Sequence, residues 1–257
     1  MASIKEAFDS TMKEAFTGIK IFLWAIPLAY ALTPLFRPNS GSMMITSVAC
    51  VLYFFLLGFV ITLAHNVISK ESTVVPGINF IVMAKNALLG LIAIIPYSLL
   101  SWLIEWGYSH VTLPNLNWDI TFKIIVHLFA VSLPVTALCI LVRRMNIVEV
   151  FNIKKYLSGV WTTFLDFAFF GIRAGLVMGV VVGLFIYLFA LFIGFDNTFW
   201  IYIMSLITMF AIVMYSNAIA QISDDIYTFA EKEEQKRRDE AHINSILEEQ
   251  SKIKDMR

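Results

Sequence analysis

Polar and ionisable side chains gather near one end of several long apolar segments. If those segments cross a membrane, each such group is costly to bury and should face protein or water. Two interpretations are open, a salt-bridged rim that fixes helix packing and a vestibule that binds a lipid headgroup or a solute. The rim is favoured, because Lys and Arg near a segment end can extend to the headgroups at little cost. We call this set the inner polar rim, and it consists of His65, Asn66, Lys85, Asn86, Arg143, Arg144, Asp166, Arg173, Gln221, Asp224 and Asp225.

Four glycines recur every four residues in one apolar segment, at Gly171, Gly175, Gly179 and Gly183. Small residues at this spacing let a second helix approach closely, which matters in lipid because packing must supply the attraction between helices. The spacing therefore predicts a tight helix contact. The partner could be a helix of the same chain, which is favoured, or a second copy; a gate or pore lining is a third interpretation.

No residue pattern indicates an enzyme. His127 lies near Lys123 on one helical face, and a lone histidine in such a place more often bonds a neighbouring helix than relays protons or binds metal. The zinc motif H-E-x-x-H, the G-x-S-x-G elbow and the Walker A loop do not occur. Asp224-Asp225 lack the spaced aspartates that hold a diphosphate through magnesium. We therefore expect a noncatalytic protein with no cofactor and no metal, the rival being a headgroup enzyme using Asp166 and this pair.

Composition places the chain in a membrane. Hydrophobic residues make up 59% of it and charged residues 15%, against about 45–50% and about 25% in soluble domains. Crossing a hydrocarbon core of about 30 Å takes around 20 apolar residues in a helix. The sequence has six such runs, which predict an all-α bundle of about six transmembrane helices: 19–36, 43–64, 80–102, 120–142, 167–193 and 199–220.

Three regions are expected. Residues 1–17 alternate apolar and charged positions with helical spacing, which predicts an amphipathic helix on the membrane surface rather than a cleavable signal peptide. Residues 18–222 form the six-helix transmembrane domain, and both cysteines fall in its apolar runs, as core residues do. Residues 223–257 form a charged cytoplasmic helix whose apolar stripe is too sparse for a coiled coil. That helix is interpreted as solvated or as a partner-binding element.

Basic residues decide the orientation. The segments joined at one face carry nearly all of the nineteen Lys and Arg, whereas Arg37 and Lys123 alone fall on the other face. The positive-inside rule therefore places both ends in the cytoplasm and the protein in the cytoplasmic (inner) membrane. A net charge of zero argues against a nucleic-acid partner.

Short motifs resemble a prokaryotic membrane family of unknown function. Gly58-Phe59 lies near the end of one run, and a charged loop, Val75-Pro76-Gly77 and a helix with Gly90 follow. The blocks 151–157 and 218–227 fit the later part of that family's pattern, and the charged tail is not covered. The resemblance implies a six-helix fold and supplies no active residues.

Together these features predict a scaffold or accessory subunit of a membrane complex. Its amphipathic segments would lie at the headgroups, and its C-terminal helix would meet a cytoplasmic partner. The alternative is a transporter or channel for a small solute or a lipid, as a homo-oligomer, that uses the glycine face and the inner polar rim.

Overall fold

The protein is all-helical throughout the part of the chain that the structure describes. The computed structural model describes residues 3–12, 17–36, 43–71, 74–111, 116–193 and 199–255, and no strand occurs among them. This confirms the predicted all-α class. The helices are α1 (Ile4–Met12), α2 (Thr17–Phe36), α3 (Met43–Ile68), α4 (Phe80–Ser109), α5 (Leu116–Arg144), α6 (Ile147–Val150), α7 (Ile153–Ile193) and α8 (Phe199–Asp255).

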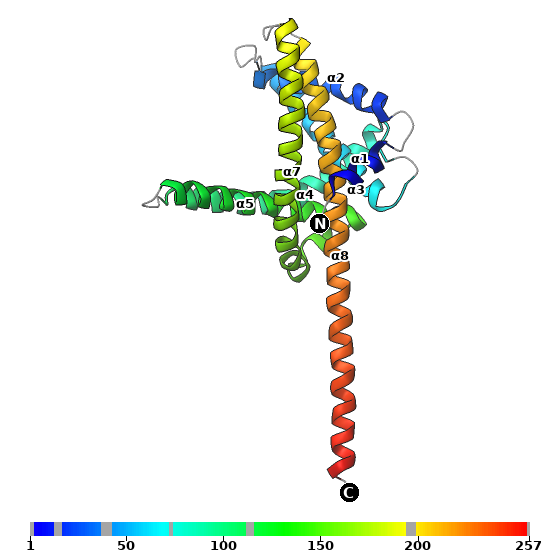
Figure 1. Ribbon diagram of the computed structural model, residues 1–257. Coiled ribbons are helices and arrows are strands. Elements are labelled where there is room, and N and C mark those ends of the chain that lie inside the picture. Colours follow the sequence, from blue (N-terminus) through cyan, green and yellow to red (C-terminus); the bar gives the residue numbers. More distant parts are fainter. Residues whose placement is uncertain are drawn as a thin grey trace.

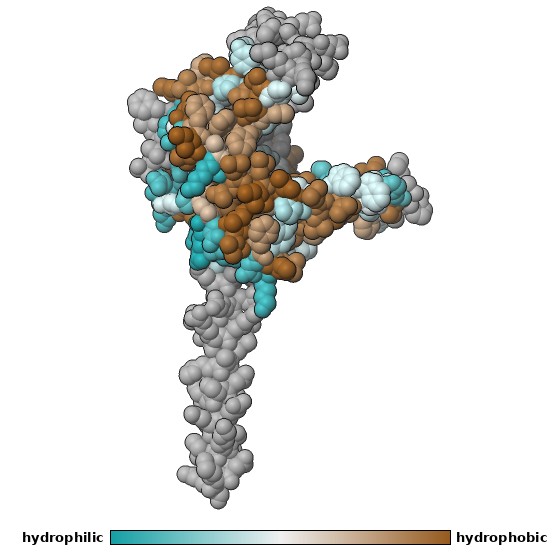
Figure 2. Space-filling view, turned by 180° about the vertical axis from the view of Figure 1, so that it is seen from behind, coloured by the Kyte–Doolittle hydropathy of each residue, from teal (hydrophilic) through white to brown (hydrophobic). Residues whose placement is uncertain are grey.

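Four of these helices are long and apolar enough to cross a membrane. They are the stretches 46–68 of α3, 80–109 of α4, 117–144 of α5 and 200–228 of α8. The described side chains of α2 form a shorter apolar stretch, 17–32. Figure 2 shows hydrophobic residues over much of the described surface of the bundle, which suits a protein surrounded by lipid.

Polar residues and unusual backbone angles mark where helices begin and end. The side chains of Asn79 and Asn146 accept hydrogen bonds from backbone N–H groups at the starts of α4 and α6, which would otherwise lack a partner. Lys70 and Met145 follow α3 and α5 with left-handed φ angles of 53° and 50°. Such a residue ends a helix by turning the chain away from its axis.

Two hydrophobic clusters hold the helices together. The larger one joins the second half of α5 to α7 and α8, with Ile140, Phe170 and Ile222 all but fully buried. The other joins α2, α3 and α8, and its largest fully buried side chain is Phe59. α8 contributes to both clusters, as do α3 and α4, and it contacts α1, α2, α3, α5 and α7.

α3 and α4 approach each other closely. A Cβ atom on Gly58 would stand 2.0 Å from the carbonyl oxygen of Met83, and one on Gly90 would stand 2.3 Å from Cδ1 of Ile61. Neither distance is compatible with a real side chain at the glycine. Gly58 therefore lets α3 approach the backbone of α4, and Gly90 makes room on α4 for the Ile61 side chain of α3.

α3 and α4 do not pair as the two antiparallel arms of a membrane hairpin. Phe55 contacts Phe80 with ring centroids 5.3 Å apart, and further along both helices Thr62 accepts a hydrogen bond of 2.8 Å from Asn86. Residue numbers thus rise together on both helices along the contact. In antiparallel neighbours they would rise on one helix and fall on the other.

The same pattern recurs between α5 and α7. The Tyr156 hydroxyl donates to the Leu133 carbonyl at 3.0 Å, and Gly159 lies against Thr136, so the numbers again rise together. Between these contacts, α4 and α5 form a hairpin that projects sideways from the bundle, across the direction of α7 and α8 (Figure 1). The sequence predicted a bundle of about six transmembrane helices, and among the described residues the α4–α5 pair runs across the other long helices (Figure 1).

α8 is one continuous helix of 57 residues. Its first half packs against α2, α3, α5 and α7, and its second half extends alone away from the bundle (Figure 1). At 1.5 Å per residue its length is about 85 Å, far more than one membrane crossing needs. The short α1 packs on α8 near the level at which α8 leaves the bundle.

Candidate functional site

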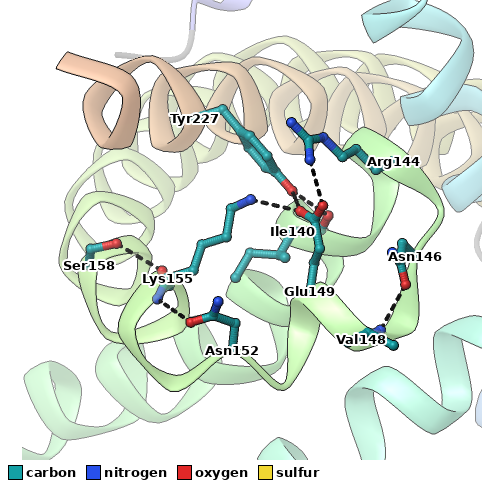
Figure 3. Close-up of polar contacts among 9 residues, drawn as sticks. All are labelled: Ile140, Arg144, Asn146, Val148, Glu149, Asn152, Lys155, Ser158 and Tyr227. Atoms are coloured by element: carbon teal, nitrogen blue, oxygen red, sulfur yellow. Dashed lines mark hydrogen bonds and ion pairs between the residues drawn. The ribbon is translucent and has the colours of Figure 1, made fainter. Parts of the chain in front are cut away.

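The densest group of polar contacts surrounds Glu149, in the short connection between α5 and α7. The Glu149 carboxylate accepts hydrogen bonds from Arg144 at 2.8 Å, from Lys155 at 2.7 Å and from the Tyr227 hydroxyl (Figure 3). We call these four residues the Glu149 cluster. Its members come from the end of α5, α6, the start of α7 and α8, so the cluster ties four elements together.

The ring of Tyr227 lies beneath several cations. The Lys155 ammonium is 3.6 Å from the ring centroid, and the guanidinium carbons of Arg143 and Arg144 are 5.4 Å and 5.6 Å from it. Cations within about 6 Å of an aromatic centroid are attracted by the ring quadrupole. Because Tyr227 is only 3% exposed, its ring and its hydroxyl both act inside the protein.

Electrostatics keep Glu149 ionised. Burial raises the pKa of this carboxyl, but hydrogen bonds from Lys155, Tyr227 and Arg144 outweigh it and lower the pKa to about 2. A group with such a pKa holds its charge throughout the physiological range. Glu149 therefore suits a fixed counterion and not a general acid or base, which needs a pKa near the working pH.

Arg143 extends the cluster along α8 by an ion pair with Asp224. Two members of the inner polar rim, Arg143 and Arg144, thus each meet a carboxylate, one of which belongs to the rim itself. Oppositely charged neighbours of this kind fix the relative position of helices. The contacts agree with the interpretation of the rim as a set of packing contacts at this point.

The rim residues of α3 and α4 make separate contacts. His65 shares a hydrogen bond of 2.7 Å with the Val142 carbonyl, so its Nδ1 carries the proton, and Asn66 donates to the Val74 carbonyl at 3.3 Å. Asn86 bonds Thr62, as described above. Lys85 is exposed. These residues link α3 to α5, to the loop after α3 and to α4, and they do not converge with the Glu149 cluster on one cavity.

A third group fastens α1 to α8. The Ser3 backbone N–H donates to the Gln221 side chain at 2.6 Å, and Gln221 donates back to the Ser3 carbonyl at 3.2 Å. Asn217, one turn earlier on α8, donates to the Thr11 hydroxyl at 3.2 Å. α1 therefore binds α8 through specific polar contacts and not through its apolar face alone.

The remaining acidic rim residues, Asp166 of α7 and Asp225 of α8, lie next to each other where the two helices meet. Asp166 is 7% exposed and lies within hydrogen-bonding distance of the Asp225 carboxylate. Arg173, two turns further along α7, is exposed. Among the described residues, no group of three or more His, Cys, Asp or Glu side chains is placed to hold a metal ion.

A polar groove lies near the free end of the α4–α5 hairpin. Glu105 of α4 accepts a hydrogen bond of 2.7 Å from Nδ1 of His127 on α5, and Lys123 pairs with Asp119 at 2.6 Å. The predicted helix-to-helix hydrogen bond of His127 is thereby confirmed. The groove has a volume of about 340 Å³ and is lined by Glu105, Tyr108, Ser109, Lys123, Val126 and His127.

Three glycines of the α7 face, Gly171, Gly179 and Gly183, have no close neighbour among the described atoms. A Cβ atom on Gly171, Gly179 or Gly183 would have no described atom within 4 Å, and the surroundings of Gly175 lie outside the described residues. Among the described residues, helices approach closely at Gly58, Gly90 and Gly159. The glycine spacing of α7 is thus available to a partner outside the described part of the chain.

Glu149, Lys155 and Tyr227 were not among the residues singled out from the sequence. One signal could have found Glu149, which is the only acidic residue between Arg143 and Lys155 in a strongly basic connection. A lone carboxylate among four cations is a natural centre for ion pairs. Tyr227 gave no such signal, because its role depends on how α8 passes the connection.

The chain was compared with family models, curated proteins and solved structures. No family model, curated protein or solved structure matches this chain. The resemblance noted around Gly58 and Gly90 is therefore without support from a family model, and no residue roles are carried over from it.

Proposed function

We propose that this protein is a noncatalytic integral membrane protein that acts as a scaffold or accessory subunit of a membrane complex. Its six apolar helices, α2, α3, α4, α5, α7 and α8, are embedded in the cytoplasmic membrane. Both ends lie in the cytoplasm, as the distribution of Lys and Arg indicates. The C-terminal helix contacts a cytoplasmic partner.

The continuity of α8 carries this proposal. A single helix runs from the apolar stretch 200–228 to Asp255, so the tail is joined to the membrane part without a flexible linker. Residues 229–255 extend about 40 Å beyond that stretch at 1.5 Å per residue. A long helix that projects alone gains little for the fold, because most helical stability in proteins comes from packing. A bound partner would supply that packing.

The Glu149 cluster supports the same role. It holds the base of the projecting helix to α5, α6 and α7 by charge-assisted hydrogen bonds, which are stronger than neutral ones. The ionised Glu149 carboxylate is already occupied by hydrogen bonds from three side chains, so it acts as a structural counterion. It fixes the direction in which the tail leaves the bundle, and a scaffold needs that direction fixed.

Mass measurement tests the proposal. The full chain and a chain ending at Ala230 are purified from the native membrane in mild detergent, and the mass of each particle is determined. The full chain should carry additional protein mass that the shortened chain loses. A double variant, Ile246→Gln with Leu247→Gln, should lose it too, whereas the matched control Asn244→Ala with Ser245→Ala should retain it. A clean monomer of the full chain would contradict the proposal.

A transporter or channel for a small solute or a lipid is the alternative function. The glycine spacing of α7 favours it, because Gly171, Gly179 and Gly183 have no close neighbour among the described atoms and small residues let a second copy approach closely. Replacing Gly175 and Gly179 with Leu should then change solute flux in liposomes or the size of the oligomer. If neither changes, the alternative is removed.

A further inference from the structure

The α4–α5 hairpin is rooted firmly across the bundle. Gly58 and Gly90 let α4 pack directly on α3, and Tyr97 of α4 stacks on Tyr156 of α7 with ring centroids 4.0 Å apart. The Tyr97 hydroxyl also donates to the Val150 carbonyl at 2.8 Å. Contacts on both sides of α4 therefore fix the hairpin across α7, and a swing to an upright position would break them.

The root lies at the tail end of the apolar stretch of α8. Arg143, at the end of α5, pairs with Asp224, and Tyr227 contacts Glu149 just beyond α5. Both α8 residues fall in the last two turns of the stretch 200–228. α1, an amphipathic helix of the kind that lies at a membrane surface, docks on Asn217 and Gln221 close by.

The free end of the hairpin stays near that level. In Figure 1 it lies to the side of the bundle, at about the height of the N-terminus. The C-terminal end of α7 and the N-terminal end of α8 lie at the top of the same view. A hairpin that crossed the membrane beside α8 would place its free end near that top. The observed hairpin runs across α8 instead.

The surface of the hairpin is apolar except on one side. Leu99, Trp102, Leu103 and Trp106 of α4 are each more than half exposed. Near the free end of the hairpin, Glu105, Lys123 and His127 line the polar groove, and Asp119 pairs with Lys123 beside it. Asp119, Lys123 and His127 are spaced four residues apart, so they share one face of α5, and Glu105 of α4 adjoins that face.

Such a surface suits the boundary between headgroups and acyl chains. Tryptophans are enriched at this depth, and a helix there keeps a polar face toward water and an apolar face toward lipid. In an upright hairpin, His127 would lie about 16 Å from the start of α5 at Leu116, near the middle of a core about 30 Å thick. An ionisable pair at that depth is costly.

We propose that the α4–α5 hairpin does not cross the bilayer but lies along the leaflet on the side of the C-terminal tail. Acyl chains cover its apolar faces, and the polar groove of Glu105, Lys123 and His127 faces the phospholipid headgroups. This rests on the proposed membrane embedding and refines it. The hairpin enters and leaves the membrane on the same face, so the N-terminus and the C-terminus remain on one side of the membrane. It also moves Lys123 to the face that carries the other basic residues.

Cysteine labelling tests where the hairpin ends. In a background with Cys50→Ala and Cys139→Ala, single cysteines are introduced as His110→Cys at the free end of the hairpin, Lys254→Cys in the tail and Ser40→Cys between α2 and α3. Membrane vesicles of either orientation are treated with a membrane-impermeant polyethylene glycol maleimide, and labelling is read as a gel shift. His110→Cys should shift in the vesicles in which Lys254→Cys shifts.

Labelling of His110→Cys from the side that labels Ser40→Cys would overturn the proposal, and so would labelling from neither side. Lys254→Cys and Ser40→Cys must label from opposite sides, which checks that each variant is inserted in one orientation. Extraction with alkaline carbonate is measured separately. Release of the protein from the membrane there would refute membrane embedding itself, and retention with wrong labelling would refute only the position of the hairpin.

Discussion

The ammonium of Lys155 lies 3.6 Å from the centre of the Tyr227 ring, while both side chains bind the same carboxylate, that of Glu149. Tyr227 thus uses its ring and its hydroxyl toward two members of one cluster. The residue belongs to α8 and Lys155 to α7, so this contact joins the projecting helix to the bundle. The two parts of the tyrosine can be separated by substitution.

Tyr227→Phe removes the hydroxyl and keeps the ring. Losing a hydrogen bond to a charged group should reduce the free energy of unfolding by about 1.5–3 kcal/mol. Tyr227→Leu also removes the attraction between the ring and the cations, and should cost at least about 1 kcal/mol more. Unfolding in detergent by a denaturant titration measures both. Tyr30→Phe, at an exposed tyrosine, is the control and should change nothing. Equal losses for Phe and Leu would mean that the ring contributes nothing.

Glu149→Gln should destabilise the protein at neutral pH by about 2 kcal/mol or more, because Lys155 and Arg144 lose their counterion. The pKa of Glu149 is about 2 in the folded protein against an ordinary value of 4.5, so its contribution is complete above pH 4.5 and fades as the pH falls toward 2. The difference between the wild type and Glu149→Gln should be constant from pH 7 to pH 5 and smaller at pH 3.

The unfolding midpoints of both chains at pH 7, 5 and 3 provide the measurement, with Glu6→Gln as the control for an exposed glutamate. If the difference between the two chains did not shrink at pH 3, Glu149 would not be the low-pKa carboxylate described here.

The sequence predicted the helical class and the apolar helices, because an apolar run of this length in lipid must satisfy its backbone hydrogen bonds internally, as a helix does. It could not predict their directions. Gly58 and Gly90 are isolated glycines in two different runs. Only the structure shows that Gly58 of α3 meets α4, that Gly90 of α4 meets α3, and that the two helices run in the same direction where they cross. In contrast, the regular glycine spacing of α7 indicated a contact that the described part of the chain does not supply.

The inner polar rim illustrates the same limit. Position near a helix end drew attention to Arg143, Arg144 and Asp224, and each of them forms an ion pair in the structure. It could not show that the rim residues fall into three separate groups: the Glu149 cluster, the contacts of α3, and the contacts by which α8 holds α1, which we call the clasp. That separation follows from helix crossings, which depend on contacts between residues far apart in sequence.

The two kinds of glycine should respond oppositely to alanine. Gly58→Ala places a methyl group against the Met83 carbonyl, so the backbones must separate, at a cost of about 1–3 kcal/mol. Gly179→Ala meets no described atom and replaces a poor helix former by the best one, so the folded chain should be unchanged or up to about 1 kcal/mol more stable. Denaturant titration in detergent compares them. A large loss of stability or of oligomer mass in Gly179→Ala would show that a partner occupies this face.

The clasp between α1 and α8 predicts how the N-terminal segment responds to proteolysis. Replacing Asn217 and Gln221 together with Ala removes the side chains that bind Thr11 and Ser3. A loss of about 1–2 kcal/mol changes an equilibrium by a factor of about 5–30, so α1 should detach that much more often. Trypsin should then cleave after Lys5 faster by a similar factor, because local opening exposes the site. Ser205→Ala, whose hydroxyl bonds only its own helix backbone among the described contacts, should leave the cleavage rate unchanged. An unchanged rate in the double variant would mean that α1 is held by its apolar face, with Ala7 and Phe8 as the residues to substitute next.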